Sequence, residues 1–516
     1  MDFGDWLAHG RHAPCSLMRM VSLRRLAAAL TVPLLLATAC SSGDPGDGVD
    51  SSADEINYRS TSGQEFSLAT TVTFKPSAET LALQGDAQKQ AILTEAQALR
   101  DTTLSTITSE LDKLWPEEMR TSNAGVAIQY RQASAALSDL QALPGGAGYS
   151  LMVSGEFAGV KDLEKKLPLK TAFGKTYLPI TADLGAGSVE LQVTVTPIER
   201  SLNAYPKYLD MFDDGLDIGV HIGGDHDTPP QDIDHARSVY DDLVASGFTS
   251  PVAKFEDLKI DSGPLTSAIK VKDKVVPVRV SIFHVDMSTP DTRNLVVDAY
   301  KNSVKTADVI IYDGHAGRQL DYSGVVLAYN PARAAIPATE FKSFVTTDKQ
   351  QVYLFNGCET YTGYADKLYE NPKRNPTNTD VITTGNFSAI QAKANQVIAF
   401  IHSFIDQKNG LWIPRSWDSV LQRMNAVGER SWVHVYGVHG LDENPKASPL
   451  ADVSKVGVAC TSDAQCGAPD SKCLVVSTSS KVCGMACADT VGCPTGTACV
   501  LPKGKTSADD AQCAPH

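Results

Sequence analysis

The stretch ADVIIYDGHAGRQ, residues 307–319, joins an apolar run to a polar, glycine-rich end. The run up to Asp313 is apolar at successive positions, a pattern typical of a strand buried on both faces of a parallel sheet. The glycines around His315 end the run and predict a turn. Ligands of parallel α/β sheets lie beyond the carboxyl ends of the strands. His315 is therefore a candidate metal ligand, a candidate half of a catalytic dyad, or an ordinary turn residue.

A second stretch of the same kind, QVYLFNGCETYTG, covers residues 351–363 and carries Cys358 after an apolar run. If the two strands are neighbours in one parallel sheet, both turns open on the same edge of that sheet. A thiol needs a nearby imidazole to become a thiolate near neutral pH, or to pass its proton to a leaving group. The two stretches together therefore predict a thiol and an imidazole at one sheet edge.

Strand patterns alternate with helix patterns from residue 213 to residue 448. Apolar strands without polar alternation, separated by helices, indicate an α/β domain with a mostly parallel sheet flanked by helices. The expected strands are 216–224, 275–285, 307–314, 351–357, 379–386 and 431–438. The expected helices are 232–248, 292–306, 336–345 and 389–406.

This layout resembles the caspase-like superfamily of cysteine peptidases, which includes caspases, legumain, gingipains, separase and the bacterial CHAT domains. In that family one strand ends in histidine and glycine, and the next ends in a small residue and the catalytic cysteine. The segment 336–363 is closest to the CHAT and gingipain-like forms, and the likeness covers residues 213 to 445. The resemblance implies a caspase/gingipain-like fold and cysteine-type peptidase activity.

By this resemblance, Cys358 is the nucleophile of acyl transfer on peptide substrates, and His315 is the general base and acid. Backbone N–H groups at the two turns would stabilise the oxyanion, and small residues would give the turns room. The residues with these supporting roles are Gly314, Ala316, Gly317 and Gly357. The candidate substrate contacts are Asp313, Glu359, His221 and Asp225.

Ala316 departs from the family pattern, in which glycine directly follows the histidine. A catalytically inactive relative that binds peptide at the cell surface is therefore the first alternative function. The second follows from DGHAG (313–317), which also resembles the Asp-Gly-His-Gly-Gly motif of metal-dependent phosphatases, where the aspartate bridges two metals that activate water. The other metal motifs of that family are missing, and a phosphatase does not account for Cys358.

The segment HIGGDHDTPPQDIDH, residues 221–235, is acidic and rich in histidine. Its spacing fits no metal-ligand pattern, so no metal ligand is predicted, and Asp232 or Asp234 is expected to cap the following helix. Ca²⁺ is the one cofactor left open, because some members of the caspase-like family use it and this segment follows the first strand of the sheet.

The N-terminus carries an export signal. Arg24 and Arg25 precede an apolar run that stops at Cys40, as in a signal peptide. The residues before Cys40 resemble a bacterial lipobox, which implies a lipoprotein signal peptide over 1–39 and a lipid anchor on Cys40. The residues before Met18 or Met20 lengthen the charged leader without adding a signal, which indicates that the true start is one of these methionines. A plain signal peptide cut near residue 39 is the alternative. Residues 40–54 are expected to be a flexible tether.

The C-terminal segment 456–516 holds eight of the 11 cysteines. An even cluster in a small, exported, Gly- and Ser-rich segment predicts a disulfide framework whose pairing the sequence leaves open. The cysteines concerned are Cys460, Cys466, Cys473, Cys483, Cys487, Cys493, Cys499 and Cys513. Cys358 remains as a solitary thiol.

Residues 55–205 are expected to form an α+β accessory domain. Apolar residues at helical spacing over 92–114 predict a helix, the stretch 127–143 predicts a second one, and the alternation in SVELQVTVT (188–196) predicts a half-exposed antiparallel strand.

The net charge of −14 argues against a nucleic-acid partner, because phosphate contacts require a basic surface. The chain as a whole is thus predicted to be an exported cysteine endopeptidase. It would act on peptides or proteins in the bacterial cell envelope, as an outer-membrane lipoprotein, or outside the cell. A membrane contact would be made through the lipid anchor alone.

Overall fold

The computed structural model describes residues 58–114, 126–129, 140–161, 165, 167–172, 174–184, 188–224, 231–385, 390–427 and 435–515. The expected signal peptide and tether, the lipid anchor Cys40 and the candidate contact Asp225 lie outside the described residues. Residues from Ser52 to His516 belong to one compact unit. The three domain boundaries expected within this unit stay predictions.

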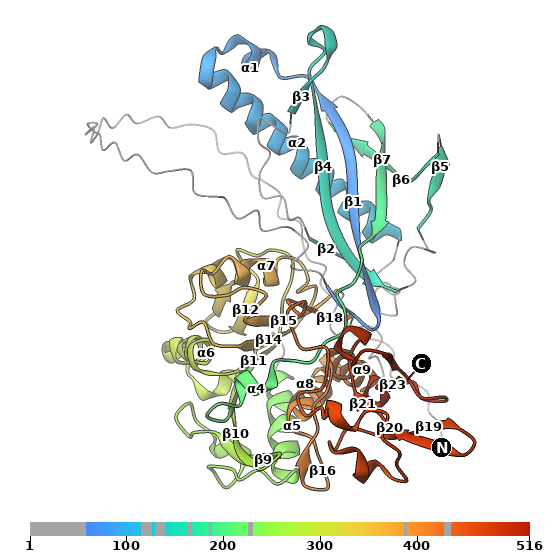
Figure 1. The fold of residues 1–516 in the computed structure, drawn as a ribbon. Helices are drawn as coiled ribbons and strands as arrows, with labels where there is room; N and C mark the ends of the chain where they lie inside the picture. The colour runs from blue at the N-terminus through green and yellow to red at the C-terminus, as the bar shows by residue number, and fades with distance from the viewer. Residues whose placement is uncertain are drawn as a thin grey trace, which may run out of the picture. The chain divides into compact units, whose positions relative to one another are not determined.

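A seven-stranded mixed sheet forms the centre of the α/β part of the chain (Figure 1). Its strands in spatial order are β18 (Tyr436–His439), β15 (Thr379–Thr384), β14 (Gln351–Asn356), β11 (Val309–Asp313), β8 (Leu216–Ile222), β10 (Lys274–Phe283) and β9 (Leu265–Val271). The strands from β15 to β10 run parallel to one another, whereas β18 and β9 pair antiparallel at the two edges. The predicted α/β class is confirmed, and each expected strand of this region is present.

The inner strands are apolar because both faces of the sheet are covered. Every residue of β11, β14 and β15 is buried. Along β11, Val309 and Ile311 belong to a cluster with the helices α5 (Asp232–Ala245), α8 (Ile390–Ile405) and α9 (Trp417–Ala426). Ile310 and Tyr312 point to the opposite cluster, with α6 (Asn294–Thr306) and α7 (Tyr364–Tyr369). This alternation is the strand period of two applied to two apolar faces.

The expected helices of this region are present with two differences. Residues 338–343 form the 3₁₀ helix η8 (Ala338–Ser343) in place of an α-helix. The prediction that Asp232 or Asp234 caps α5 is wrong, since the helix begins at Asp232 and its N-cap is Gln231. Both carboxylates instead lie in the first turn, where the helix dipole favours negative charge.

Several short elements of this region were not predicted. The antiparallel hairpin β12 (Gly324–Ala328) and β13 (Ala334–Pro337) follows the turn that bears His315 and packs on the α6 face. The edge strand β9 and the helices α7 and α9 were not predicted either. The remaining ones are α4 (Tyr208–Met211), η5 (Phe255–Asp257), η6 (Val285–Met287), η7 (Pro290–Thr292), β16 (Gln407–Lys408) and β17 (Leu411–Trp412).

The N-terminal part contains a second, antiparallel sheet (Figure 1). Its spatial order is β2 (Val126–Gln129), β4 (Tyr149–Val160), β1 (Gly63–Phe74), β7 (Ser188–Pro197), β6 (Lys175–Asp183) and β5 (Lys170–Ala172), with β3 (Leu140–Ala142) beside β4. The helix α2 (Gly85–Leu114), preceded by α1 (Ala78–Ala82), packs its apolar residues on this sheet.

Two expectations for this part are confirmed and one is wrong. The helix expected over 92–114 is present within α2, and β7 buries Leu191 and Val193 while Glu190 and Gln192 stay exposed. The helix expected over 127–143 is contradicted at its two described ends, because Val126–Gln129 and Leu140–Ala142 are strands paired with β4; residues 130–139 lie outside the described residues. Hydrogen bonds to a long neighbouring strand override the local helical pattern there.

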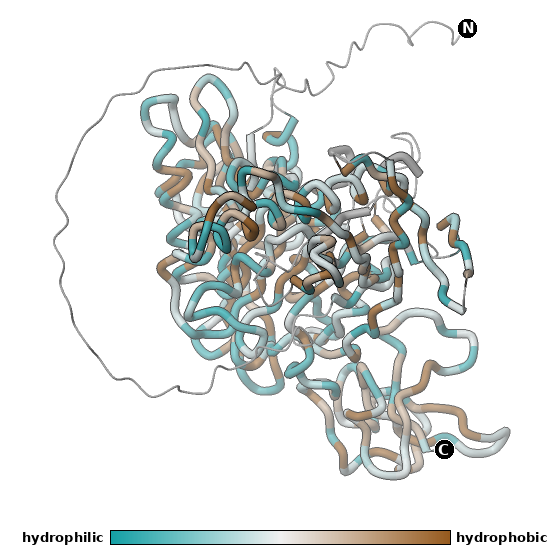
Figure 2. The backbone as a smooth tube through the Cα atoms, turned by 90° about the horizontal axis from the view of Figure 1, so that it is seen from above, coloured by the Kyte–Doolittle hydropathy of each residue, from teal (hydrophilic) through white to brown (hydrophobic). Residues whose placement is uncertain are grey.

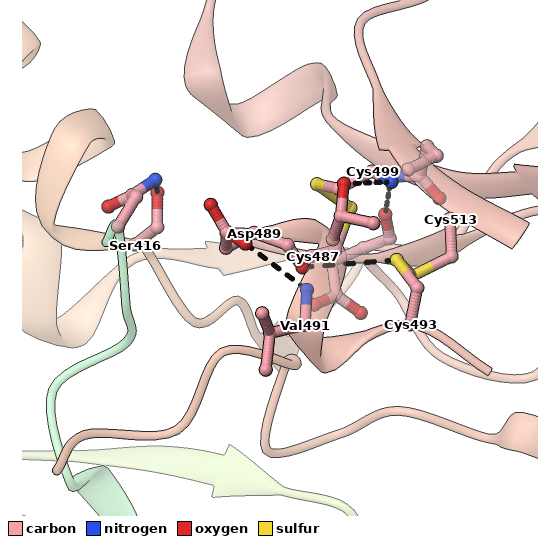
Figure 3. The surroundings of a disulfide bond; sticks show 11 residues. Ser416, Cys487, Asp489, Val491, Cys493, Cys499 and Cys513 are labelled. Carbon is pink, nitrogen blue, oxygen red and sulfur yellow. Dashed lines mark hydrogen bonds between the residues drawn. A yellow bond between two sulfur atoms is a disulfide. The ribbon is translucent and has the colours of Figure 1, made fainter. Parts of the chain in front are cut away.

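The C-terminal part is held by four disulfides, which confirms the predicted framework. The pairs are Cys460–Cys473, Cys466–Cys483, Cys487–Cys499 and Cys493–Cys513; the last two lie close together (Figure 3). The strands are the hairpin β19 (Cys473–Ser477) and β20 (Ser480–Cys483) and the sheet of β21 (Met485–Ala486), β23 (Gln512–Pro515) and β22 (Thr497–Val500). Disulfides of this density are characteristic of exported proteins.

None of the helices in the described part of the chain combines the length and the apolar composition needed to cross a lipid bilayer. In Figure 2 the brown, hydrophobic stretches of the coloured tube are short and are interrupted by white and teal ones.

Peptide mapping without reduction tests the disulfide pattern. We expect cross-linked peptides for the four pairs within residues 460–513, and a peptide containing Cys358 in the thiol form, because Cys358 is the free cysteine of the described chain. Any cross-link from Cys358 to one of these cysteines would contradict the structure.

Candidate active site

The strands that carry His315 and Cys358 are direct neighbours. β11 and β14 run parallel, and their last residues, Asp313 and Asn356, are partners in the register. His315 and Cys358 each lie two residues beyond that pair, at equivalent positions on the same edge of the sheet. The expected adjacency of the two strands is confirmed.

The two turns beyond these strands contact each other. A Cβ atom added to Gly357 would lie 2.5 Å from the Cβ of Ala316 and 3.0 Å from the carbonyl oxygen of Gly314. The Gly314 N–H donates to the carbonyl oxygen of Asn356 at 3.2 Å. Glycine at position 357 therefore allows the backbone before Cys358 to approach the residue that follows His315.

His315 and Cys358 are both partly exposed, and His315 contacts Tyr329, which lies just after β12. The Tyr329 ring meets the His315 ring edge-on, with centroids 5.3 Å apart. Burial raises the pKa of Tyr329, and the charge of an ionised Cys358 acts in the same direction, so the thiol lies within electrostatic range of the phenol. The His315 backbone is fixed by the buried Tyr312, whose hydroxyl donates to its carbonyl oxygen at 2.6 Å.

Glu359 joins the two turns. Its carboxylate pairs with the guanidinium of Arg318 at 2.5 Å, and its side chain is only 10% exposed. Its φ of 53° places it in the left-handed region, which shows how tightly the chain turns after Cys358. An engaged, largely buried carboxylate does not fit the substrate contact expected for Glu359.

Two further candidate contacts are buried. Asp313 is 0% exposed; its Oδ1 accepts from Asn356 Nδ2 at 3.0 Å, and its Oδ2 lies 3.1 Å from His235 Nδ1. A carboxylate in this position offers no surface to a substrate, nor to the two metals of the phosphatase alternative. His221 is also 0% exposed, inside β8, so the expectation that it contacts substrate is wrong.

The surroundings of His221 explain its burial. Its ring stacks on Phe283 with centroids 4.8 Å apart, and its Nε2 lies 2.9 Å from the hydroxyl of Ser303 on α6. Burial lowers the pKa of His221 to about 3, so the ring is neutral at physiological pH.

The backbone N–H groups expected to bind an oxyanion are not equally available. The Gly314 N–H donates to the carbonyl oxygen of Asn356, and the Gly357 N–H donates to that of Phe355. The Gly317 N–H donates to the hydroxyl of Tyr364. Within the described residues, no acceptor is found for the N–H of Ala316. The oxyanion role expected for Gly317 therefore does not fit its hydrogen bond, and Ala316 is the better candidate on this turn.

The described residues contain two groups of side chains that are close enough together to share a metal ion. The groups of three or more His, Cys, Asp or Glu side chains close enough to share an ion consist of cysteines that form the disulfides. The Ca²⁺ expectation for residues 221–235 falls mostly on 225–230, which lie outside the described residues.

Sequence patterns did not identify the residues that support the two turns. Arg318 follows His315 in the same turn, and its partner Glu359 lies on the other turn. Tyr329, His235 and Tyr436 contact the site from three other segments of the chain. The one usable signal was Asn356, a polar residue at the end of an apolar run, equivalent in position to Asp313.

Comparison with protein-family models, with curated proteins and with solved structures finds no match to this chain. The chemistry assigned to the site therefore rests on the geometry above.

The contact between the turns can be tested with Gly357→Ala. The added methyl group would press on Ala316, and we expect a loss of about 1–3 kcal/mol in stability, the usual range for overpacking. Ala316→Gly in the same chain removes the nearest clashing atom and is expected to restore part of the loss. Thermal melts of the wild type and the two variants measure this, and an unchanged melt of Gly357→Ala would contradict the close approach.

The neutral state of His221 gives a pH prediction. Its pKa is about 3 when folded and 6.5 when unfolded, so below pH 6.5 the unfolded chain takes up a proton that the folded chain does not. The stability of the wild type relative to His221→Gln should thus fall as the pH drops from 6.5 toward 3, by up to about 1.4 kcal/mol per pH unit. Denaturant unfolding at several pH values measures the difference. A constant difference would contradict the burial of a neutral ring.

Proposed function

We propose that this protein is an exported cysteine endopeptidase of caspase-like fold, in which Cys358 and His315 cleave peptide bonds. One observation carries the proposal: an imidazole and a thiol outside the four disulfides occupy equivalent positions beyond two neighbouring parallel strands, on turns that touch. The partial exposure of both residues leaves the edge open to a substrate.

The reaction would be acyl transfer. The Cys358 sulfur attacks the peptide carbonyl carbon, with its proton passing to His315, and a tetrahedral oxyanion forms. The N–H of Ala316 would donate to that oxyanion. The C–N bond then breaks as His315 returns the proton to the leaving amine. Water, deprotonated by His315, hydrolyses the thioester, releases the acid and regenerates the thiol.

The cellular setting follows from the two ends of the chain. The four disulfides support an oxidising, extracytoplasmic compartment. The lipobox-like sequence before Cys40 extends this to a lipid-anchored protein of the cell envelope whose substrates are peptides or proteins.

A non-catalytic peptide-binding protein of the same fold is the second candidate. The observation in its favour is Ala316, whose methyl group lies beside Gly357 where the caspase-like family has glycine.

Thiol labelling separates the two candidates. We expect a peptide-based electrophile to modify Cys358 in the folded protein near neutral pH, and His315→Ala to slow this by at least about 100-fold, the lower end of general acid–base contributions. Peptide mapping by mass spectrometry assigns the modified cysteine, and turnover of a peptide library is measured in parallel.

His402→Ala is the matched control. His402 lies on α8 and pairs with Asp242 at 2.6 Å, so its loss removes an imidazole without touching the two turns. If the electrophile labels Cys358 at the wild-type rate in both His315→Ala and His402→Ala, the dyad is refuted. Labelling that depends on His315 without turnover of any peptide would favour the binding protein.

A further inference from the structure

We propose that Asp313 and Asn356 are positioning residues, which hold the turns of His315 and Cys358 in the arrangement that allows the two side chains to react. The inference rests on the proposed function and deepens it. It assigns roles to two buried residues that do not touch the substrate.

Asp313 and Asn356 form the last residue pair between the two strands. Asp313 and Asn356 are register partners at the carboxyl ends of β11 and β14, and Asn356 Nδ2 donates to Asp313 Oδ1 at 3.0 Å. The backbone adds a second link, since the Gly314 N–H donates to Asn356 O. Both residues are 0% exposed. The point from which both turns depart is thus fixed by side-chain and backbone bonds.

The pair is also held from both sides. His235 on α5 has its Nδ1 3.1 Å from Asp313 Oδ2, within hydrogen-bond distance. The hydroxyl of Tyr436 on β18 donates to Asn356 Oδ1 at 2.5 Å. The amide of Asn356 therefore donates at one end and accepts at the other, which fixes its orientation.

The polar pair Asp313–Asn356 follows apolar pairs along the same two strands. The preceding rungs of the same two strands pair Ile311 with Leu354 and Tyr312 with Phe355, and they are buried in the two apolar clusters. The backbone ladder joins the strands whatever the side chains are, and a well-packed apolar pair is often at least as stable as a buried polar one. A hydrogen-bonded pair next to the reacting turns instead fixes the orientation of those turns, and catalysis by proximity requires a fixed orientation.

Exchange of the two side chains tests the proposal. Asn356→Asp sets two carboxylates against each other, and we expect Cys358 labelling and kcat to fall at least about 10-fold with KM little changed. The double variant Asn356→Asp with Asp313→Asn restores one carboxylate and one amide. It is expected to recover most of the lost rate, because the donor and the acceptor merely change places.

Asn371→Asp is the matched control. Asn371 lies just after α7 and is 2% exposed. Its amide donates to the backbone carbonyl oxygens of Phe341 and Phe344. This variant should lower the melting temperature without lowering the labelling rate of the folded protein. The positioning role is refuted if Asn356→Asp folds and its Cys358 is labelled at the wild-type rate. It is also refuted if the double variant does not recover the labelling rate, or if Asn371→Asp lowers that rate as much as Asn356→Asp does.

A cross-linking assay keeps this result separate from the proposed function. In the His315→Cys background, mild oxidation joins position 315 to Cys358 at a rate that reports how close the two turns are held. We expect Asn356→Asp to slow this cross-link and the exchange to restore it, even if the wild type cleaves no peptide. A wild type without His315-dependent labelling refutes the peptidase, whereas a cross-linking rate unaffected by Asn356→Asp refutes the positioning.

Discussion

The parallel pairing of β11 with β14 determines where every candidate reacting group lies. Parallel strands present their carboxyl ends at one edge, so whatever follows them is brought together. The pairing also requires both faces of the sheet to be covered, since a parallel strand is reached through crossovers that place helices on the sheet. The helices α5, α8 and α9 on one face and α6 and α7 on the other meet this requirement.

The parts of the structure that could be predicted are those governed by local patterns. The segments 309–312 and 352–355, which precede His315 and Cys358, are continuous apolar runs because their strands are buried on both sides, and this pattern is visible in the sequence. The disulfide framework was predictable because eight cysteines crowd a short segment that has little apolar material for a core.

The parts that were missed depend on contacts between distant residues. His221 precedes a polar segment, but Phe283 and Ser303 enclose it from other elements, so its burial cannot be read from its neighbours. Asp313 looked exposed beside a glycine turn, yet Asn356 and His235 satisfy its carboxylate inside the fold. The strands Val126–Gln129 and Leu140–Ala142 carry a helical pattern and are extended only because β4 pairs with them.

The free thiol of Cys358 has to persist in a compartment that oxidises cysteines. The eight cysteines of the C-terminal part are paired with one another, so they offer no internal thiol for exchange with Cys358. An imidazole that raises the thiolate fraction also makes the sulfur easier to oxidise. Cys358 is partly buried, and the residue after it, Glu359, is ion-paired with Arg318, so part of the Cys358 surface is shielded from oxidants. In the proposed peptidase, the same shielding would protect the nucleophile.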